Sequence, residues 1–530
     1  MNDEATYTTE KTVWQPRVNP WIIGVVVALA AFMEVLDTSI ANVALPHMAG
    51  DLGASNNEST WVLTSYLVAN AIILPASGWL VSVFGRKRLF MTCIAFFTIS
   101  SFLCGISSSL GFLLLARILQ GAFGGGLQPM AQAVLADSFP PEKRGLAFAL
   151  YGVTAVCAPA IGPTLGGWIT DSFSWRWIFF INIPVGILTL VLVYMLLEDP
   201  PYLKELKRGL ASFDAIGFSL LVLGVGALQI LLDKGQEDDW FGSRFITTLV
   251  VLSVVSFISL VVWEWHHKEP IVDVRLFKNF SFAIGNVMFL MLGISLMAST
   301  VLIPQFLQTL MGYTAQQAGM VLTSGALVTL LSIPIIGKLT TLVQARYLIA
   351  FGWITMAASL FISSRENSLT MSFNGASWLR ILQSFPMAFL FIPITLAGYV
   401  GLAANKNNAA SGIMNFMRNI GQSIGTSTVT TLIARRTQFH QTILSEHTSS
   451  GHFQATVAGL GSQLSSAGLG DHAAHRQAVG RLYFMLQSQA TALSYVDVYW
   501  ILGIGSAIMF FLSFMMRKNE VGKGESMSVH

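Results

Sequence analysis

Long apolar stretches recur along almost the whole chain, and they constrain its fold more than any other feature. A helix needs about 20 mostly apolar residues to cross a membrane. Only 11% of the 530 residues are charged, whereas soluble domains carry about 25%. The sequence therefore predicts an all-α membrane protein and excludes a soluble enzyme. Fourteen stretches qualify as spans: 20–45, 60–82, 89–108, 112–136, 145–170, 177–197, 213–232, 245–266, 280–304, 317–338, 345–363, 377–403, 410–434 and 495–516.

The distribution of positive charge predicts how these spans cross the membrane. If the N-terminus lies inside, the inside segments hold 19 of the 30 Lys and Arg residues, the outside segments hold 8, and 3 lie within spans. Cytoplasmic loops are typically enriched in Lys and Arg. We therefore expect fourteen spans with both tails, 1–19 and 517–530, in the cytoplasm.

A faint internal repeat divides the chain into two halves. Arg-Ile-Leu-Gln occurs at 117–120 in the fourth span and at 380–383 in the twelfth, and a second matching pair begins at Gly78 and Gly337. The offsets of 263 and 259 residues both relate one span to the eighth span after it. Two helical halves around a central site are typical of secondary transporters. We predict two six-helix halves at 20–197 and 280–516, with two inserted helices at 213–266.

The only long hydrophilic segment between spans is predicted on the outside, at 436–490. It holds five of the nine His residues, but their spacing fits no metal motif and no Cys accompanies them. A solvated loop with a docking role is favoured over a metal site. The net charge of +3 gives no indication of a nucleic-acid partner, and none is expected.

Glu34, Asp37 and Arg117 are charged residues deep within predicted spans, where charge costs about 2.5–3.5 kcal/mol on insertion scales. Glu34 and Asp37 are three residues apart and share one helix face. The helical rise places Asp37 about 13 Å and Arg117 about 8 Å below the outer membrane surface, so an Arg side chain can reach the carboxylate. An Asp37 that exchanges Arg117 for a proton would carry protons. A static ion pair is the alternative for Asp37, and both interpretations stay open for Glu34.

Several polar residues within spans are candidates for lining a cavity. Arg418 lies deep, and it either faces a cavity or caps neighbouring carbonyl groups. Arg380 lies near a helix end, where it can extend to the surface, and we assign it no role. Acidic residues at helix ends, including Asp137, are likewise assigned none. The cavity candidates are Asn42, Gln120, Asn415, Arg418 and Asn419.

The fifth predicted span contains a segment of small residues and prolines. Gly residues spaced by four let a neighbouring helix approach closely, and Pro bends a helix. We therefore expect a tightly packed kink between the halves. Its residues are Pro159, Gly162, Pro163, Gly166 and Gly167.

No enzymatic signature accompanies these spans. The sequence has no G-x-x-x-x-G-K-[ST] loop for nucleotide binding and neither H-E-x-x-H nor G-x-S-x-G for hydrolysis. All three Cys residues lie in apolar stretches and are expected to be inert. We expect a transporter that needs no cofactor; these residues alone leave open which ion drives it.

Together, these motifs resemble the fourteen-helix drug:proton antiporters of the major facilitator superfamily, in particular the EmrB-type exporters. The first-helix motif is Leu-Asp-Thr-Ser-Ile-Ala-Asn-Val-Ala-Leu-Pro at 36–46. The 159–167 segment is similar to the antiporter motif of this superfamily, and Arg117 with Gln120 resembles its helix-four motif. The segments 175–184, 213–214 and 233–240 resemble the fourteen-helix branch. The resemblance extends from about 20 to 516 and is weakest at 436–490.

One motif departs from the family pattern. The loop after the second helix normally reads Gly-x-Leu-x-Asp-x-x-Gly-Arg-Lys, and Ser82 replaces its Asp. The resemblance implies a cytoplasmic gate here, and we expect the gate to be weakened or built differently. The gate residues carried over are Gly78, Gly85, Arg86 and Lys87.

The resemblance implies export of hydrophobic drugs from the cytoplasm or inner leaflet by alternating access, in exchange for protons. It implies that Asp37 and Arg117, with Glu34 as a further candidate, form the coupling site. It also implies an inner-membrane location, a periplasmic adaptor protein and an outer-membrane channel as partners. Two alternatives stay open: export of one physiological solute, and a non-transporting receptor or scaffold. The short inside segments argue against the receptor.

Overall fold

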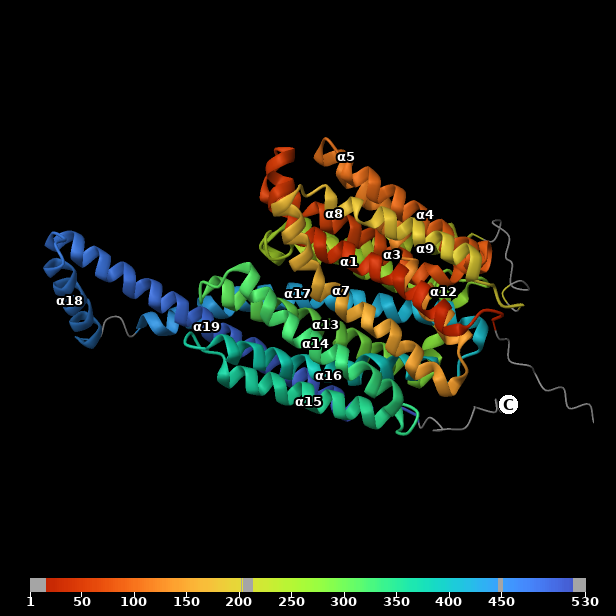
Figure 1. Cartoon of the computed structure of the whole chain (residues 1–530). Helices are drawn as coiled ribbons and strands as arrows, with labels where there is room; N and C mark the ends of the chain where they lie inside the picture. Colours follow the sequence, from red (N-terminus) through yellow and green to blue (C-terminus); the bar gives the residue numbers. More distant parts are fainter. Residues whose placement is uncertain (1–15, 202, 204–212, 447–450, 518–530) are drawn as a thin grey trace, which may run out of the picture.

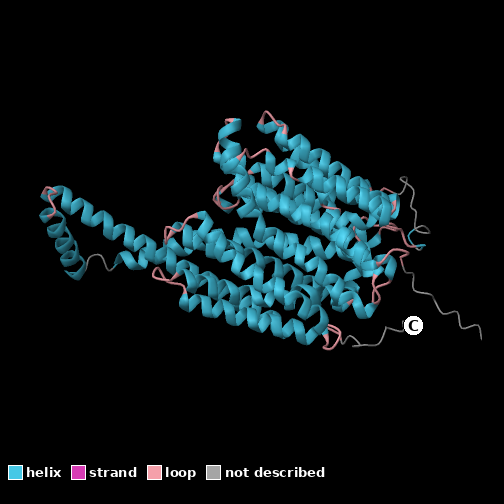
Figure 2. Cartoon of the chain, viewed as in Figure 1, coloured by secondary structure: helices cyan, strands magenta, loops and turns pink. Residues whose placement is uncertain are grey.

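The computed structural model describes residues 16–201, 203, 213–446 and 451–517. These residues form helices and short connections, with no β-strand among them (Figure 2). The all-α prediction is therefore confirmed. Most of the predicted terminal tails, at 1–15 and 518–530, lies outside the described residues.

The N-terminal part of the chain forms one group of packed helices (Figure 1). Pro20 at the first position and the Asn19 side chain, which accepts from the Trp21 N–H, begin α1, as expected at a helix start. Near the other end of the bundle, Ser55 and Glu58 cap the short α2 reciprocally. The helices are α1 (Pro20–Leu52), α2 (Asn56–Ser59), α3 (Trp61–Phe84), α4 (Arg86–Gly105), α5 (Leu110–Gly124), α6 (Leu127–Ser138), α7 (Arg144–Ser172), α8 (Trp177–Phe180) and α9 (Asn182–Leu196).

A second group of helices forms the C-terminal part, and an extra pair precedes it. The pair, α11 (Ala215–Lys234) and α12 (Arg244–His266), packs together, and α11 contacts both α3 and α17. Most of α12 faces outward with apolar side chains, including Val255, Ile258 and Val262. The remaining helices are α13 (Phe280–Thr309), α14 (Ala315–Leu339), α15 (Ala345–Glu366), α16 (Phe373–Tyr399), α17 (Asn407–Glu446), α18 (Gly451–Ser466) and α19 (Asp471–Ser513).

Twelve helical segments among the described residues are long and apolar enough to span a membrane. The α7 helix is a thirteenth candidate; it bends by about 40° between Arg144–Pro159 and Ile161–Ser172. The expected span at 410–434 lies in α17, which is not among these candidates. The chain is thus a multi-pass membrane protein, and the count of fourteen spans is not confirmed.

The hydrophilic segment at 436–490 differs from the expected loop. The α17 helix continues to Glu446, α18 follows, and α19 begins at Asp471, so the described part is almost entirely helical. These elements form a helical extension that projects from one end of the bundle (Figure 1). Val457 and Leu464 pack against Ala474 and Ala478 in a small core of their own. This core explains why a polar sequence is helical here.

Candidate functional site

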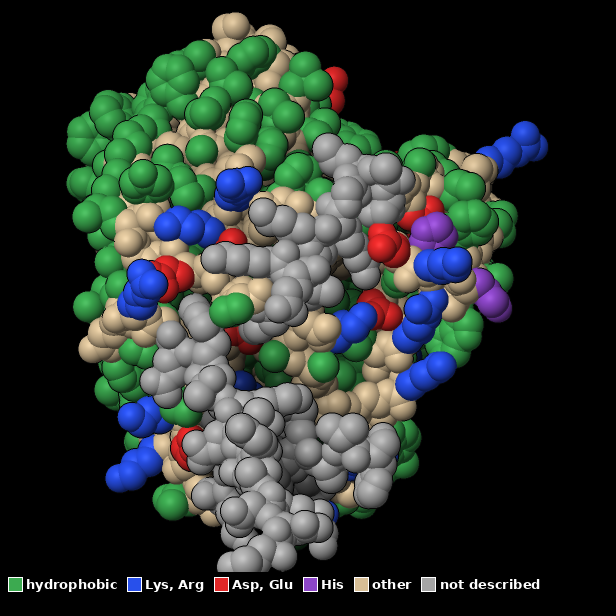
Figure 3. Space-filling view, turned by 90° about the vertical axis from the view of Figure 1, so that its right-hand side faces the viewer, with side chains coloured by type: hydrophobic (Ala, Val, Ile, Leu, Met, Phe, Trp, Pro, Cys, Tyr) green, Lys and Arg blue, Asp and Glu red, His purple; other side chains and the backbone are tan. Residues whose placement is uncertain are grey.

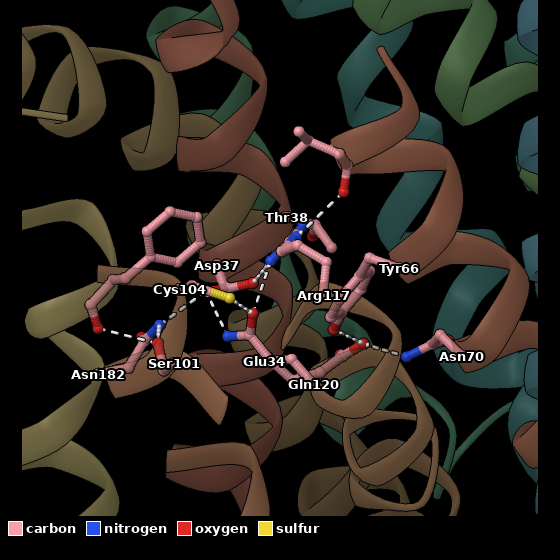
Figure 4. A network of polar contacts seen from close by, with 12 residues as sticks. Glu34, Asp37, Thr38, Tyr66, Asn70, Ser101, Cys104, Arg117, Gln120 and Asn182 are labelled. Carbon is pink, nitrogen blue, oxygen red and sulfur yellow. Dashed lines mark hydrogen bonds and ion pairs between the residues drawn. The ribbon is translucent and has the colours of Figure 1, made fainter. Parts of the chain in front are cut away.

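The carboxylate of Asp37 on α1 lies within a buried polar cluster to which α3, α4, α5 and α9 also contribute (Figure 4). Its Oδ2 atom lies 2.6 Å from Nη1 of Arg117 on α5. Its Oδ1 atom accepts hydrogen bonds from Gln120 on α5 at 2.9 Å and from Asn182 on α9 at 2.7 Å. Asp37 is 2% exposed and Arg117 is fully buried. The structure thus brings together Asp37, Arg117 and Gln120, and adds Asn182.

The surroundings hold Arg117 in one orientation. Its Nε donates to the Val62 carbonyl at 3.1 Å, and its Nη1 also donates to Gln120 Oε1 at 2.8 Å. The guanidinium lies 4.3 Å from the ring centroid of Tyr66 on α3, within the range of a cation–π contact. A buried ion pair requires such additional partners, because two charges removed from water lose their hydration.

Glu34 lies one helical turn from Asp37 and has a different environment. It accepts hydrogen bonds from the Tyr66 hydroxyl at 3.2 Å, from the Asn70 amide at 2.9 Å, and from the Gln128 amide on α6. No ion pair to this 3%-exposed side chain occurs in the described part of the chain. Tyr66 therefore contacts both sites: its hydroxyl binds Glu34 and its ring faces Arg117 (Figure 4).

The Glu34 cluster extends into the second group of helices. Gln128 Oε1 accepts from the Tyr151 hydroxyl on α7 at 2.9 Å and from Nη2 of Arg418 on α17. The Arg418 guanidinium also lies 5.6 Å from the ring centroid of Phe391 on α16. Glu34 is thus connected through one glutamine to a cation of the other half, whereas the direct partners of Asp37 all belong to the first half.

A row of polar contacts joins α6 and α17 beyond this point. Asn415 donates to Gln132 Oε1 at 2.8 Å, and Ser411 donates to the Pro129 carbonyl at 2.8 Å. Because α6 and α17 belong to different halves, these hydrogen bonds must break before the two halves can separate here.

The 159–167 segment packs closely against α1. A Cβ atom at Gly162 would lie 2.5 Å from the Ser39 Cβ, and one at Gly166 would lie 3.1 Å from the Ile40 carbonyl oxygen. Ser39 Oγ donates to the Pro159 carbonyl at 3.3 Å. Gly167 takes no part in this close approach. Pro159 and Pro163 lie within α7, which is bent as expected. The close packing is against α1 of the same half, however, and not between the halves as predicted.

The residues of the expected gate lie at the end of the bundle opposite the helical extension. Gly85 adopts a φ of +82° between α3 and α4, in the region that glycine tolerates best. Arg86 Nη2 lies 2.5 Å from Oδ2 of Asp137 at the end of α6. Oδ1 of the same Asp137 accepts from the Asn407 amide of α17 at 2.6 Å. Arg86 and Asp137 thus connect the halves through Asn407.

The other gate positions have separate roles. Gly78 abuts Ala409 of α17, because a Cβ there would lie 2.6 Å from the Ala409 Cα. The Lys87 side chain donates to the Tyr194 carbonyl on α9, away from the boundary between the halves. Ser82 donates to the Trp79 carbonyl in its own helix and takes no part in the ion pair.

The remaining candidates lie apart from the buried cluster. Asn42 is exposed, and Asn419 accepts from Gln229 of α11 at 3.1 Å. Arg380 does not extend to the surface as expected, since its Nη1 donates to the Ser299 carbonyl on α13 at 2.8 Å. The sequence analysis assigned no role to Asp137, and this prediction was wrong. Its side chain is buried and forms the ion pair with Arg86.

Five contributors were absent from the sequence-based set: Tyr66, Asn70, Gln128, Tyr151 and Asn182. They are uncharged, so the cost of burying charge gives no signal for them. One signal could have indicated Gln128: it is a polar residue within an apolar stretch, directly after the Gly-rich turn at 124–126. No group of three or more His, Cys, Asp or Glu residues suited to a metal ion occurs in the part that the structure describes.

Comparison with known proteins gives the family. The sequence profile of the Major Facilitator Superfamily matches residues 27–426. The chain belongs to this superfamily of membrane transporters. It is 38% identical to the "Multidrug export protein EmrB" of Escherichia coli (strain K12) over 479 residues, which cover 90% of this chain and 92% of that protein.

Two further relatives and one structure agree with this assignment. The chain is 42% identical to the "Probable multidrug resistance protein EmrY" of E. coli (strain K12), covering 80% and 82% of the two chains. It is 38% identical to the "Fatty acid resistance protein FarB" of Neisseria gonorrhoeae, covering 84% and 86%. The human organic anion transporter MFSD10 (TETRAN) has the same fold, with a TM-score of 0.59 at 12% identity, covering 94% of this chain and all of that one.

The family assignment confirms a major facilitator fold and the transporter class. Transporters of this superfamily need no cofactor, as expected for this chain. The roles of individual residues stay predictions.

Proposed function

We propose that this chain is a proton-coupled exporter of hydrophobic drugs and other toxic compounds. The observation that carries the proposal is the buried Asp37–Arg117 pair at 2.6 Å, in a chain similar over most of its length to multidrug export proteins. A buried carboxylate with an Arg partner can exchange that partner for a proton, because protonation removes the charge that the guanidinium balances.

Alternating access supplies the order of events. In the outward-facing state Asp37 takes a proton and its ion pair with Arg117 breaks. Arg117 keeps its bonds to the Val62 carbonyl and to Gln120. In the inward-facing state drug enters the passage between the halves, the proton leaves to the cytoplasm, and the ion pair forms again.

Glu34 is proposed as a second coupling group. Gln128 hydrogen-bonds both to Glu34 and to Arg418 of the other half. A change in the charge of Glu34 therefore alters contacts in both halves. The bend of α7 and its close packing against α1 at Gly162 and Gly166 support a role for this helix in positioning α1, which carries Glu34 and Asp37.

The proposed topology has fourteen spans and both ends in the cytoplasm. It requires α17 to cross the membrane, which its packing against α13, α3 and α19 supports. Lys and Arg side chains gather on the end of the bundle opposite the helical extension (Figure 3), as expected for a cytoplasmic face. The helical extension then lies in the periplasm. The proposal keeps the division into two halves and an inserted pair of helices.

An inner-membrane location with a periplasmic adaptor and an outer-membrane channel completes the proposal. The helical extension is the proposed contact for the adaptor, since it projects from the bundle and carries exposed Tyr483, Phe484 and Met485. Exposed aromatic residues are common in protein–protein interfaces.

A dedicated exporter of one solute is the second candidate, supported by the relative named for fatty acid resistance. A panel of chemically dissimilar dyes tests the difference in proteoliposomes. A multidrug exporter accumulates several of them under an imposed pH gradient, whereas a single-solute carrier ignores most of them. Absence of any gradient-driven transport for the dyes and for fatty acids would contradict both.

A further inference from the structure

The second copy of the Arg-Ile-Leu-Gln repeat lies in α16, where the proposed proton cycle gives it no role. Arg380 and Gln383 follow Arg117 and Gln120 by 263 residues, and Ser299 on α13 follows Asp37 by 262. In the first half, Arg117 contacts the carboxylate of Asp37. In the second half, Arg380 contacts Ser299. The repeat therefore places a serine where its first copy has the counter-ion.

Arg380 consequently has hydrogen bonds but no anion. Its Nη1 donates to the Ser299 carbonyl at 2.8 Å and to the Ser299 hydroxyl at 3.1 Å. Its Nε atom is buried and has no partner. No ion pair to Arg380 occurs in the described part of the chain. Removing a guanidinium from water without a counter-ion costs free energy. Binding of an anion beside Arg380 would lower this cost.

Arg380 lies on the same face of α16 as a residue that contacts the other half, and its guanidinium points to α13. Arg380 and Phe391 are eleven residues apart, close to three helical turns, so they share one face. Phe391 stacks on Tyr151 of α7, with ring centroids 5.9 Å apart. Arg380 lies about 16 Å from Phe391 along this face, toward the start of α16. It is also partly exposed, whereas Arg117 is fully buried.

The neighbouring helix leaves room for the side chain. A Cβ atom at Gly325 of α14 would lie 2.8 Å from Cγ and 3.1 Å from Nε of Arg380. The glycine lets α14 pass beside the guanidinium, which is thus held between α13 and α14.

We propose that Arg380 and Ser299 form an anion-binding subsite between α13, α14 and α16, which takes the carboxylate of an amphiphilic substrate. This proposal rests on the proposed export function and specifies one class of its substrates. A guanidinium binds a carboxylate through paired N–H groups, and the Ser299 hydroxyl lies beside it as a further donor. The apolar part of the substrate extends along the face that carries Phe391.

The test measures binding without any gradient. The full-length protein in lipid nanodiscs is titrated calorimetrically with octanoate and with octan-1-ol, which has the same chain but no charge; empty nanodiscs are the blank. The wild-type protein is expected to bind octanoate more tightly than octan-1-ol. Arg380→Gln is expected to weaken octanoate binding at least roughly tenfold and to leave octan-1-ol binding unchanged.

A second variant supplies the missing carboxylate from within. Ser299→Asp reproduces the arrangement that Asp37 has with Arg117, and it is expected to weaken octanoate binding to a similar extent because the subsite is then filled. If Arg380→Gln loses both ligands through misfolding, Ser299→Asp decides the question. Octanoate binding within twofold of wild type in the folded variants, or no preference for octanoate in the wild type, would overturn the proposal. Gradient-driven export of a cationic dye by the wild-type protein tests the export function separately.

Discussion

At Gln128, a single amide side chain connects two helices of the first half to the second half. It donates to Glu34 and accepts from Tyr151 and Arg418. Loss of such a residue leaves a buried acceptor and a buried cation with fewer partners, and an unsatisfied buried group costs about 1–3 kcal/mol.

Gln128→Ala is therefore expected to lower the stability of the protein by about 1–3 kcal/mol, measured by thermal unfolding of the purified protein. Gln477→Ala is the matched control, because Gln477 is exposed on α19 and such substitutions usually change stability by less than about 0.5 kcal/mol. Equal melting temperatures for the two variants would contradict the connecting role of Gln128.

The residues of the site differ in how far the sequence predicts them. Asp37 and Arg117 were paired from their depths in the membrane, because a helix has a fixed rise per residue and buried charge is rare. Asp137 was missed because a position at a helix end indicates water, whereas its side chain is 4% exposed. Gln128 was missed because its side chain is uncharged, so the cost of burying charge gives no signal for it.

Among the helices, α13 and α17 approach each other most closely at glycines. A Cβ atom at Gly421 would lie 2.1 Å from the Leu290 carbonyl oxygen, and one at Gly293 would lie 2.2 Å from the Arg418 carbonyl oxygen. Small residues at such positions allow close packing of membrane helices. The contact lies beside Arg418, so it also positions that side chain.

Gly421→Ala is expected to push α17 from α13 and to destabilise the protein by about 1–3 kcal/mol, with a lower unfolding temperature in detergent. Gly480→Ala in α19 serves as control, because nothing lies within 4 Å of a Cβ there and alanine favours a helix. A Gly421→Ala variant as stable as the control would show that the close approach is not required.

The sequence predicted most helices of the bundle but not the helical extension. Spans are predictable because apolar length is required to cross a membrane. The segment after 434 is polar, and its helicity depends on a small core formed by Val457, Leu464, Ala474 and Ala478. A stripe of four apolar residues at helical spacing is a weak signal in a segment of this composition.

For the whole molecule, the helical extension and the transport bundle are expected to have separable functions. The α18 helix packs on α19 beyond the bundle (Figure 1). Replacement of 451–466 by a flexible Gly-Ser segment of equal length should leave gradient-driven dye accumulation in proteoliposomes within about twofold of wild type. In cells that carry the adaptor and channel, drug resistance should fall.

Measurement of both properties on the same variant tests this division. Loss of accumulation in proteoliposomes would mean that the helical extension belongs to the transport cycle. Full resistance in cells would mean that an adaptor binds elsewhere.

The central claim, that Asp37 couples proton movement to export, is tested most directly by dye flux in proteoliposomes with an imposed pH gradient. Wild-type protein should accumulate dye. Asp37→Asn should lose accumulation while still exchanging dye across the membrane without a gradient, because the neutral amide cannot carry a proton. Asp51→Asn, which removes an exposed carboxylate 3.1 Å from Arg176, should behave as wild type. Undiminished accumulation by Asp37→Asn would contradict the account.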